Sequence, residues 1–409
     1  MSRKKILYVE SNTDGTVGGS HFSLLFLIEG LNKEIYEPIV AFYQKNYLIP
    51  RYERAGCKVI KMNKTGALNI LEKYPILKKV KMHTLHYRVI VKPLIAIQKA
   101  INYLNTFIIP SAKCWRILTT EGIELVHLNN TISRPQEWIL ASIFAKTKVI
   151  AHERGINVMF PTQSIFWSRY LRAIICISDA VKSNLIRKGI NDIKLFRIYN
   201  GLDPEKFKVN RSREDVFAEF GISNGVPVIG IIGNIKRWKG QETVLYALKI
   251  VKEFMPHIRC MIIGDVAESD RYYLRKLEDI VKIENIEENI IFTGPRKDIP
   301  DLLNCMSLLI HASIEPEPFG RTLLEGMALR KPIISTNIGA PREIIIDGET
   351  GILVTPGKPE EIAWAIKRIL SDNRLAEKMG EAGYKRLVKE FNIRKNVVST
   401  ESIYSVVLS

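Results

Sequence analysis

The stretch Ala312–Leu329, ASIEPEPFGRTLLEGMAL, decides the fold of this 409-residue chain. It follows an apolar run at 308–310 that is typical of a buried parallel strand, and two prolines in the stretch then interrupt regular structure. Gly320 allows the backbone to turn into a helix that we expect to begin near Arg321. The pattern predicts a strand, a tight loop and a helix. The unpaired N–H groups at the start of such a helix suit a phosphate.

Two carboxylates flank this predicted turn. Glu317 lies on the loop and Glu325 lies in the first turns of the helix. An ionised carboxylate accepts protons from two hydroxyl groups at once, which suits a sugar. The alternative is a helix with solvated acids near its N-terminus, where the helix dipole favours them anyway. The stretch alone therefore indicates a sugar and a phosphate bound side by side.

The spacing of these residues resembles that of a known family. Glu317-x7-Glu325, with Phe319-Gly320 between them, is similar to the signature of retaining glycosyltransferases of family 4, which have the GT-B fold. The resemblance implies an α/β protein with two Rossmann-like, doubly wound parallel-sheet domains that face a central cleft. The resemblance is specific over 227–366, weaker but continuous over 4–42 and 125–207, and essentially absent over 70–117.

The length of the chain indicates two domains, because single hydrophobic cores stop growing below this size. We expect residues 1–203 to form a Rossmann-like acceptor-binding domain and residues 204–390 to form a nucleotide-sugar-binding domain. The resemblance implies that a C-terminal helix, 391–409, packs back on the first domain. No internal repeat is found.

The cysteines and the apolar segments indicate a cytoplasmic protein. The five cysteines lie far apart without a CxxC pair, which fits free thiols better than disulfides or a zinc site. The apolar run at the N-terminus is too short for a signal peptide, and no window reaches the ~18 apolar residues of a membrane span. A peripheral position on the inner face of the cell membrane is the second option.

The positive charge is concentrated in one part of the chain. The formal net charge is +17, and residues 51–120 hold 14 Lys and Arg against two acids. Such a region suits an anionic membrane, nucleic acid or a phosphorylated acceptor, and the alternative is a solvated face. Within it, 70–117 reads as mainly helical, with apolar residues at three- and four-residue steps. We expect burial of this stripe in the core in preference to membrane contact. The stripe includes Ile90, Leu94, Ile97 and Ile101.

The first half of the chain offers two candidate sites at strand ends. A glycine-rich loop at 11–20 follows the first strand, and the resemblance assigns Gly18-Gly19 to the approach of the donor diphosphate and the acceptor. A structural tight turn is the alternative. His152 ends a later strand, where parallel sheets bind their ligands. The resemblance makes His152 the active-site histidine, acting through its backbone carbonyl or its ring. Arg154, two residues later, is a separate candidate for holding an anionic group.

The second half of the chain offers cations for the diphosphate. Asn234, Arg237 and Lys239 follow an apolar strand near 226–233, so they are expected at the carboxyl edge of a parallel sheet. Lys and Arg can neutralise a diphosphate without a metal. Lys239 matches the family lysine, whereas Asn234 replaces the family's arginine and Arg237 is expected to supply that charge. By resemblance, the remaining donor ligands are Pro295 and Arg296 at the base, and Phe319, Gly320, Arg321, Thr322 and Glu325.

Together with these features, the resemblance implies a metal-independent, retaining hexosyltransferase. By resemblance, Glu317 holds the sugar hydroxyls, Glu325 the ribose, and Lys239 stabilises the departing diphosphate, so that Lys239, Glu317 and His152 form the catalytic set. The resemblance implies a nucleotide-sugar donor, with UDP expected in preference to GDP, and the basic segment leads us to expect a glycan or lipid-linked acceptor of cell-surface polysaccharide or glycolipid synthesis. No cofactor, metal or nucleic acid is expected, and residues 51–120 are expected to contact anionic membrane. The alternatives are a non-catalytic nucleic-acid or anionic-surface binder and a GT-B sugar-nucleotide epimerase.

Overall fold

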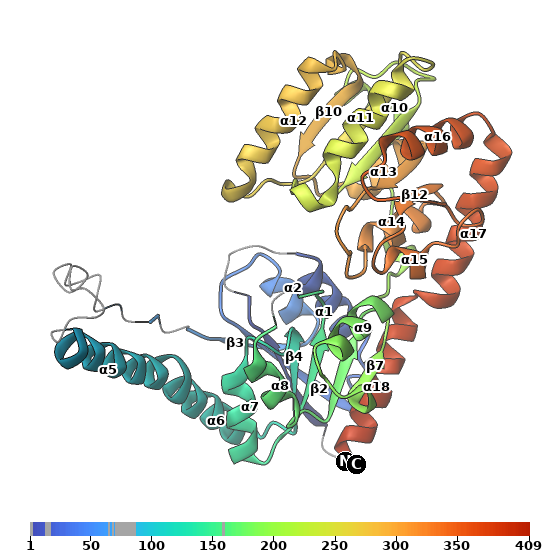
Figure 1. Cartoon of the computed structure of the whole chain (residues 1–409). Helices are drawn as coiled ribbons and strands as arrows, with labels where there is room; N and C mark the ends of the chain where they lie inside the picture. The colour runs from blue at the N-terminus through green and yellow to red at the C-terminus, as the bar shows by residue number, and fades with distance from the viewer. Residues whose placement is uncertain (1–2, 13–17, 64–65, 68, 70–86, 158–159) are drawn as a thin grey trace. The chain divides into compact units, whose positions relative to one another are not determined.

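The chain divides into two compact units. The structure, a computed structural model, describes residues 3–12, 18–63, 66–67, 69, 87–157 and 160–409 (Figure 1). The first unit comprises Met1–Ile175, Leu185–Phe196 and Glu401–Ser409, and the second comprises Cys176–Asn184 and Arg197–Thr400. The chain thus passes into the second unit shortly before residue 203, the predicted boundary. Of the predicted C-terminal helix, only 401–409 belongs to the first unit.

The first unit is built on a parallel sheet. Among the described residues it has seven strands in the order β3-β2-β1-β4-β5-β6-β7. Because β1 pairs in parallel with both β2 and β4, the strand order reverses at β1 and β4, which is where such sheets bind ligands at their carboxyl edge. The strands are β1 (Lys4–Glu10), β2 (Tyr36–Phe42), β3 (Lys58–Lys61), β4 (Leu125–Asn130), β5 (Lys148–Glu153), β6 (Ala173–Cys176) and β7 (Leu195–Arg197).

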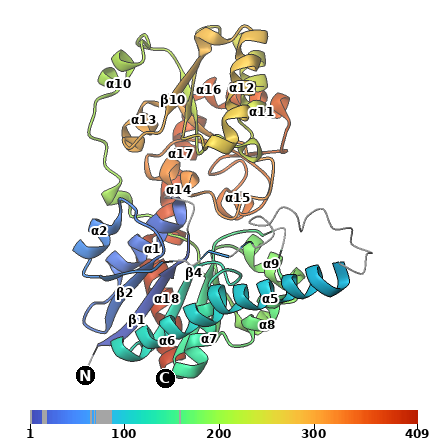
Figure 2. The ribbon, with the colours of Figure 1, turned by 90° about the vertical axis from the view of Figure 1, so that its left-hand side faces the viewer.

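Helices connect these strands, as expected for right-handed parallel crossovers. Figure 2 shows α1 beside β1 and β2 and α7 on the other side of the sheet. Ser178 precedes α9 and caps it, because its Oγ accepts a hydrogen bond from the backbone N–H of Val181 at 3.1 Å. The helices are α1 (Gly19–Gly30), α2 (Ile49–Arg54), α5 (Lys92–Tyr103), α6 (Ile109–Glu121), α7 (Gln136–Ala145), α8 (Thr162–Ser168) and α9 (Asp179–Arg187).

The basic region forms a helical arm, defined here as residues 87–121. It contains α5 and α6 together with two π-helical turns, Tyr87–Val91 and Leu104–Ile108, and Figure 1 shows α5 projecting from the first unit. The expected burial of its apolar stripe is wrong for the described residues: α5 has no buried residue and Ile97 is 52% exposed. The physical reason is that, among the described residues, α5 makes its main contacts with the π-helical turns that precede and follow it. The predicted helical part at 70–86 lies outside the described residues.

The last helix of the chain, α18 (Ile393–Leu408), completes the core of the first unit. Tyr404 is fully buried there. Its hydroxyl lies 2.6 Å from Nδ1 of His127 and donates a hydrogen bond to the hydroxyl of Tyr8 at 3.2 Å. Since a buried polar group must find a partner, this triad fixes the end of the chain against β1 and β4.

The second unit repeats the same design. Its sheet has six strands among the described residues, in the order β10-β9-β8-β11-β12-β13, so the strand order reverses between β8 and β11. β8 pairs in parallel with β9 and with β11, and the strands are rich in Ile and Val, which is typical of sheets covered on both faces. The strands are β8 (Val228–Ile232), β9 (Arg259–Ile263), β10 (Ile290–Gly294), β11 (Leu308–His311), β12 (Ile333–Thr336) and β13 (Ile352–Val354).

Helices cover this second sheet and bury its core. Ile229 and Ile231 of β8 pack with Leu245 and Leu248 of α11, all buried. The predicted turn into a helix at Arg321 is confirmed, because α14 begins there and Gly320 has the left-handed φ of 89°. The helices are α10 (Arg213–Glu219), α11 (Gln241–Lys252), α12 (Arg271–Ile283), α13 (Ile299–Cys305), α14 (Arg321–Ala328), α15 (Pro341–Ile344), α16 (Pro359–Leu370) and α17 (Asn373–Glu390).

Two further predictions concern the whole chain. The five cysteines, all among the described residues, form no disulfide and are buried, in line with the expectation of thiols. Among the helices that the structure describes, none has the length and the apolar character needed to cross a membrane.

Candidate functional site

The centre of the candidate site in the second unit is an ion pair between Lys239 and Glu317. Nζ of Lys239 lies 2.6 Å from Oε2 of Glu317, and Ser313 donates a hydrogen bond to the same oxygen at 3.1 Å. Lys239 follows β8 and Glu317 follows β11, the two strands at which the order of the sheet reverses. The structure thus brings two of the three predicted catalytic residues together at the ligand-binding edge of the sheet.

The backbone around Gly240 forces this approach. Gly240 has a φ of +74°, and a Cβ built on it would lie 1.9 Å from the carbonyl oxygen of Ala312, so no other residue fits. The backbone N–H of Ile314 donates to the carbonyl of Trp238 at 2.8 Å. Close contact between the loops after β8 and β11 therefore holds Lys239 against Glu317.

Glu317 is a carboxylate in a buried setting. It is 7% exposed, and burial acts to raise its pKa, but the charge of Lys239 and contact with His311 outweigh burial and lower the pKa to about 2. Nε2 of His311 lies 3.3 Å from Oε2 of Glu317. Glu317 is therefore ionised at neutral pH, and it accepts protons readily from hydroxyl groups.

The N-terminus of α14 lies beside this pair. Gly320 has a φ of +89°, and a Cβ there would lie 3.1 Å from Cδ1 of Leu323 and 3.4 Å from Nε2 of His311, so glycine is favoured where the chain enters the helix next to the Glu317 cluster. In α14, an oxygen of Glu325 lies 3.8 Å from Nη2 of Arg321. Burial raises the pKa of Glu325, and Arg321 opposes this rise. The helix start thus provides N–H groups, a guanidinium and a carboxylate in one place.

The remaining predicted donor ligands have different surroundings. Asn234 and Arg237 are exposed in the loop after β8, and the carbonyl of Asn234 accepts a hydrogen bond from Gln241. Thr322 is half-buried in the first turn of α14. The ring of Phe319 is buried and packs against the rings of Tyr199 and Phe391 at 6.2 and 6.3 Å, which anchors the loop.

The predicted base-binding loop is locked by ion pairs. Arg296 forms ion pairs with Glu219 and Asp298 at 2.7 and 2.6 Å, so its charge is already neutralised. Pro295 beside it is exposed. The charge of Arg296 is thus committed to local structure, and a role at the base would fall to the backbone of this loop.

A polar cluster occupies the corresponding edge of the first sheet. Glu10 ends β1 and accepts hydrogen bonds from Asn129 at 2.7 Å and from Asn130, both at the end of β4. Arg154, just after β5, donates to the amide oxygen of Asn129 at 2.7 Å and lies 3.3 Å from Nδ1 of His152. His152 is thus placed at the carboxyl edge of the first sheet, near the reversal of strand order.

His152 is a neutral imidazole with a defined tautomer. Burial, Arg154 and His127 hold its pKa well below the usual range. Because a guanidinium only donates, Nδ1 of His152 accepts the hydrogen bond and the ring proton lies on Nε2. Nε2 is buried, and among the described residues it has no hydrogen-bond partner. The ring therefore offers a free N–H donor.

The glycine pair of the first unit begins a helix. Gly18 is the N-cap of α1, and its N–H group donates to Nδ1 of His21 at 3.3 Å, while Gly19 is the first helical residue. Gly15 and the middle of this loop lie outside the described residues. The pair therefore has at least the structural role of starting α1 beside Glu10.

A cavity of about 570 Å³ opens at the same edge of the first sheet. It contains residues that follow β2, β3 and β4, and aromatic rings line one part of it. The ring centroids of Tyr103 and Phe107 lie 5.2 Å apart, and those of Phe107 and Trp167 lie 5.8 Å apart. An aromatic wall of this kind suits the face of a sugar or an apolar chain.

The sequence analysis missed several of these residues. His311 is the last residue of β11, and Ser313 follows two residues later, just before the predicted loop. Their position after a parallel strand could have identified them as candidate site residues. Glu10 is a further residue of this kind, because an acid that ends the first strand of a doubly wound sheet lies at the ligand-binding edge.

Comparison with known proteins finds similarity to glycosyltransferases. Residues 212–386 match the family model described as "Glycosyl transferases group 1". The chain is 28% identical over 247 residues to the capsular polysaccharide biosynthesis glycosyltransferase CapM of Staphylococcus aureus, covering 58% of this chain and 62% of CapM. It is 27% identical over 308 residues to N-acetyl-alpha-D-glucosaminyl L-malate synthase of Bacillus anthracis, covering 73% and 78% of the two chains.

The fold is also that of solved structures. The crystal structure of Anabaena Alr3699/HepE in complex with UDP and glucose matches with a TM-score of 0.79 at 20% identity, over 99% of this chain and 100% of the other. At this identity the match concerns the fold alone. The predicted fold class, GT-B with two doubly wound parallel sheets, is confirmed.

Proposed function

Because residues 212–386 match the family model described as "Glycosyl transferases group 1", we propose that the chain belongs to this family and transfers a hexose from a nucleotide-diphosphate sugar with retention of configuration. The observation that carries the proposal is the Lys239–Glu317 pair at the strand reversal of the second sheet. UDP is the preferred nucleotide. The acceptor is a glycan or a lipid-linked sugar, in line with the polysaccharide role named for CapM.

The chemistry follows from the charges around this pair. Lys239 and the N-terminus of α14 stabilise the negative charge that grows on the departing diphosphate, and Arg237 and Arg321 add to the positive field. Glu317, ionised and held by Lys239, accepts hydrogen bonds from sugar hydroxyls, and Glu325 does the same for the ribose. These protein cations would neutralise the diphosphate, which a divalent ion does in metal-dependent enzymes. We therefore expect transfer without added metal.

The first unit provides groups for the acceptor. Its aromatic cavity, with Tyr103, Phe107 and Trp167, is proposed to hold the acceptor glycan or its lipid chain. The neutral ring of His152 is proposed as a donor to a sugar oxygen, through the N–H group that has no partner among the described residues. A neutral donor suits an oxocarbenium-like sugar better than an imidazolium does, because it adds no positive charge.

The helical arm is proposed to contact anionic membrane. Ile97, Leu104 and Ile109 are 52, 51 and 44% exposed along the arm, and Lys92 and Lys99 are exposed beside them. An exposed apolar stripe flanked by lysines is typical of helices that lie in a membrane interface. This contact would bring the first unit to a lipid-linked acceptor.

The test measures donor binding and product formation. Calorimetric titration of UDP- and GDP-sugars into the purified chain should give the highest affinity for a UDP-hexose. Lys239→Gln should weaken this affinity by roughly 10- to 150-fold, as expected when a hydrogen bond to a charged group worth ~1.5–3 kcal/mol is lost. NMR of the product should show the anomeric configuration of the donor, and EDTA should leave the rate unchanged.

Lys236→Gln is the matched control. Lys236 belongs to the same loop, but its Nζ lies 4.0 Å from Asp270, away from Glu317. Equal losses in both variants, or full donor affinity in Lys239→Gln, would refute the role of the pair. Epimerised donor without any transfer would instead identify a sugar-nucleotide epimerase.

A further inference from the structure

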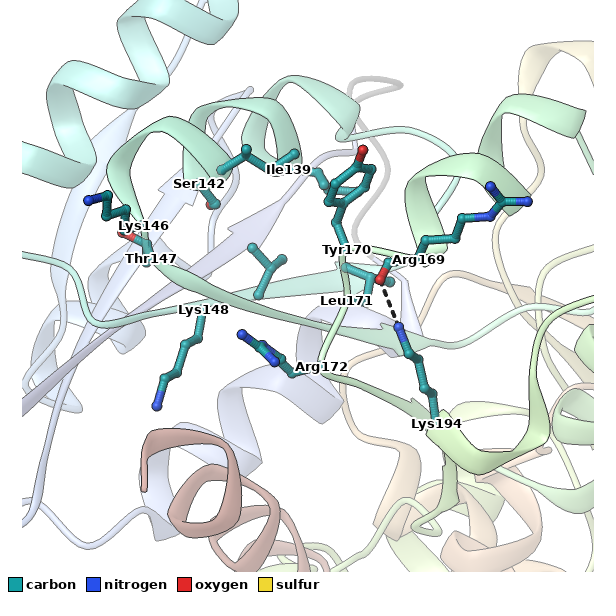
Figure 3. A pocket seen from close by; sticks show the side chains of 12 residues that line it. Ile139, Ser142, Lys146, Thr147, Lys148, Arg169, Tyr170, Leu171, Arg172 and Lys194 are labelled. Carbon is teal, nitrogen blue, oxygen red and sulfur yellow. Dashed lines mark hydrogen bonds between the residues drawn. The ribbon is translucent and has the colours of Figure 1, made fainter.

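A second cavity lies at the opposite, amino edge of the first sheet. Its volume is about 560 Å³, and its lining includes Lys146, Lys148, Arg169, Arg172 and Lys194 (Figure 3). None of the residues that line it is acidic. The proposed transferase function does not use this cavity, because its groups lie at the carboxyl edges of the sheets.

Three neighbouring strands bring these cations together. Lys148 is the first residue of β5, Arg172 directly precedes β6, and Lys194 directly precedes β7. Since the amino ends of parallel strands meet at one edge, the three side chains share one opening. In Figure 3 the side chain of Arg172 lies between those of Lys148 and Lys194, whereas Arg169 extends away from the cavity.

The cations stand over an apolar floor without acidic partners. Val149 and Leu171 are buried beneath them, at 2 and 1% exposure. Among the described residues, no carboxylate forms an ion pair with Lys148, Arg172 or Lys194, and no acid lines the cavity. Nζ of Lys194 donates instead to the carbonyl of Arg169 at 2.8 Å. Burial and the charge of Arg172 both lower the pKa of Lys194, as expected for like charges held close together.

A fourth cation occupies a backbone position that disfavours lysine. Lys146 ends α7 with a φ of 56°, a left-handed conformation in which glycine or asparagine is preferred. Its backbone N–H caps the helix by donating to the carbonyl of Ile143. The side chain therefore adds charge at the rim of the cavity at a small cost in backbone energy.

We propose that this basic cavity is a binding site for a phosphate group. A phosphate dianion would relieve the repulsion between Lys148, Arg172 and Lys194, accepting two parallel hydrogen bonds from the guanidinium and one from each ammonium group. A monovalent carboxylate would neutralise less of this charge. The phosphate can be a free anion or the headgroup of a lipid, and the experiment separates these two sources.

The test titrates inorganic phosphate into the full-length protein and follows its 31P NMR signal and the thermal midpoint. The combined variant Lys148→Gln/Arg172→Gln/Lys194→Gln should bind phosphate at least tenfold more weakly and should lose the phosphate-dependent rise of the midpoint. The control Lys208→Gln/Arg374→Gln/Lys378→Gln removes the same charge from exposed positions of the second unit and should bind like the wild type. Lys146→Gly should fold at least as stably as the wild type and still bind more weakly, which separates binding from folding.

Sedimentation with phosphatidic acid and phosphatidylcholine vesicles distinguishes the two sources. Loss of binding to phosphatidic acid in the combined variant but not in the control, without binding of free phosphate, identifies a lipid headgroup. Binding of free phosphate alone identifies a soluble anion. Equal behaviour of the combined variant and the control in both assays overturns the proposal. Loss of phosphate binding only in Lys239→Gln also overturns it, because the anion then belongs to the donor site.

Discussion

Replacing Glu317 by Gln removes the charge of the central ion pair and keeps its shape. The pKa of Glu317 falls from 4.5 to about 2 in the folded protein. A shift of one unit corresponds to ~1.4 kcal/mol, so the ionised form contributes about 3 kcal/mol to the free energy of unfolding at pH 7. Neither partner is strongly exposed, at 20 and 9% of the side chains, so solvent screening is limited. Glu317→Gln should therefore destabilise the second unit by about 3 kcal/mol and lower its thermal midpoint by roughly 6–12 °C.

The dependence on pH makes this prediction specific. A group whose folded pKa is depressed stabilises the fold above its unfolded pKa, and this contribution is lost as the pH falls through the folded value. The difference between wild type and Glu317→Gln, measured by urea unfolding, should be constant from pH 7 to about 5 and should shrink between about 4.5 and 2. Glu349→Gln, at an exposed acid of the same unit, is the control. A difference below ~1 kcal/mol at pH 7, or one that does not change with pH, would refute the reasoning.

Two further substitutions test the backbone and the core. Gly240→Ala places a Cβ 1.9 Å from the carbonyl oxygen of Ala312 at a φ of +74°, so it should cost at least ~2 kcal/mol and weaken nucleotide-sugar binding; unchanged urea unfolding would contradict the tight approach of the two loops. Tyr404→Phe leaves His127 and Tyr8 without their shared hydroxyl partner and should cost ~1–3 kcal/mol in urea unfolding, whereas Tyr47→Phe, at a ring that is 66% exposed, should change little.

The strands and turns of the second unit were predictable from local sequence. The apolar run before the quoted stretch is β11, Gly320 makes the turn, and α14 begins at Arg321, because these features depend on neighbouring residues only. The contact of Glu317 with His311 and Ser313 was not predicted. It depends on how the loop folds back over the end of β11, which no local pattern encodes.

Features that depend on partners distant in sequence were harder to predict. The periodicity of α5 correctly indicated an amphipathic helix, but it does not say what covers the apolar face, and the expected burial is wrong. The basic cavity is a similar case. Lys148, Arg172 and Lys194 are each unremarkable in sequence, and only the alignment of three parallel strands gathers them at one edge.

The place of Tyr404 in the first unit has a consequence for biosynthesis. The second unit has its full set of residues once Thr400 has been synthesised, whereas the first unit lacks Tyr404 and the rest of 401–409 until the ribosome has read past them. Most of the first unit is therefore translated before the second unit, but the first unit can complete its folding only after the second unit has been synthesised. Until then, His127 and Tyr8 lack their hydroxyl partner, and a nascent chain stalled before residue 404 should present this unfilled core to chaperones.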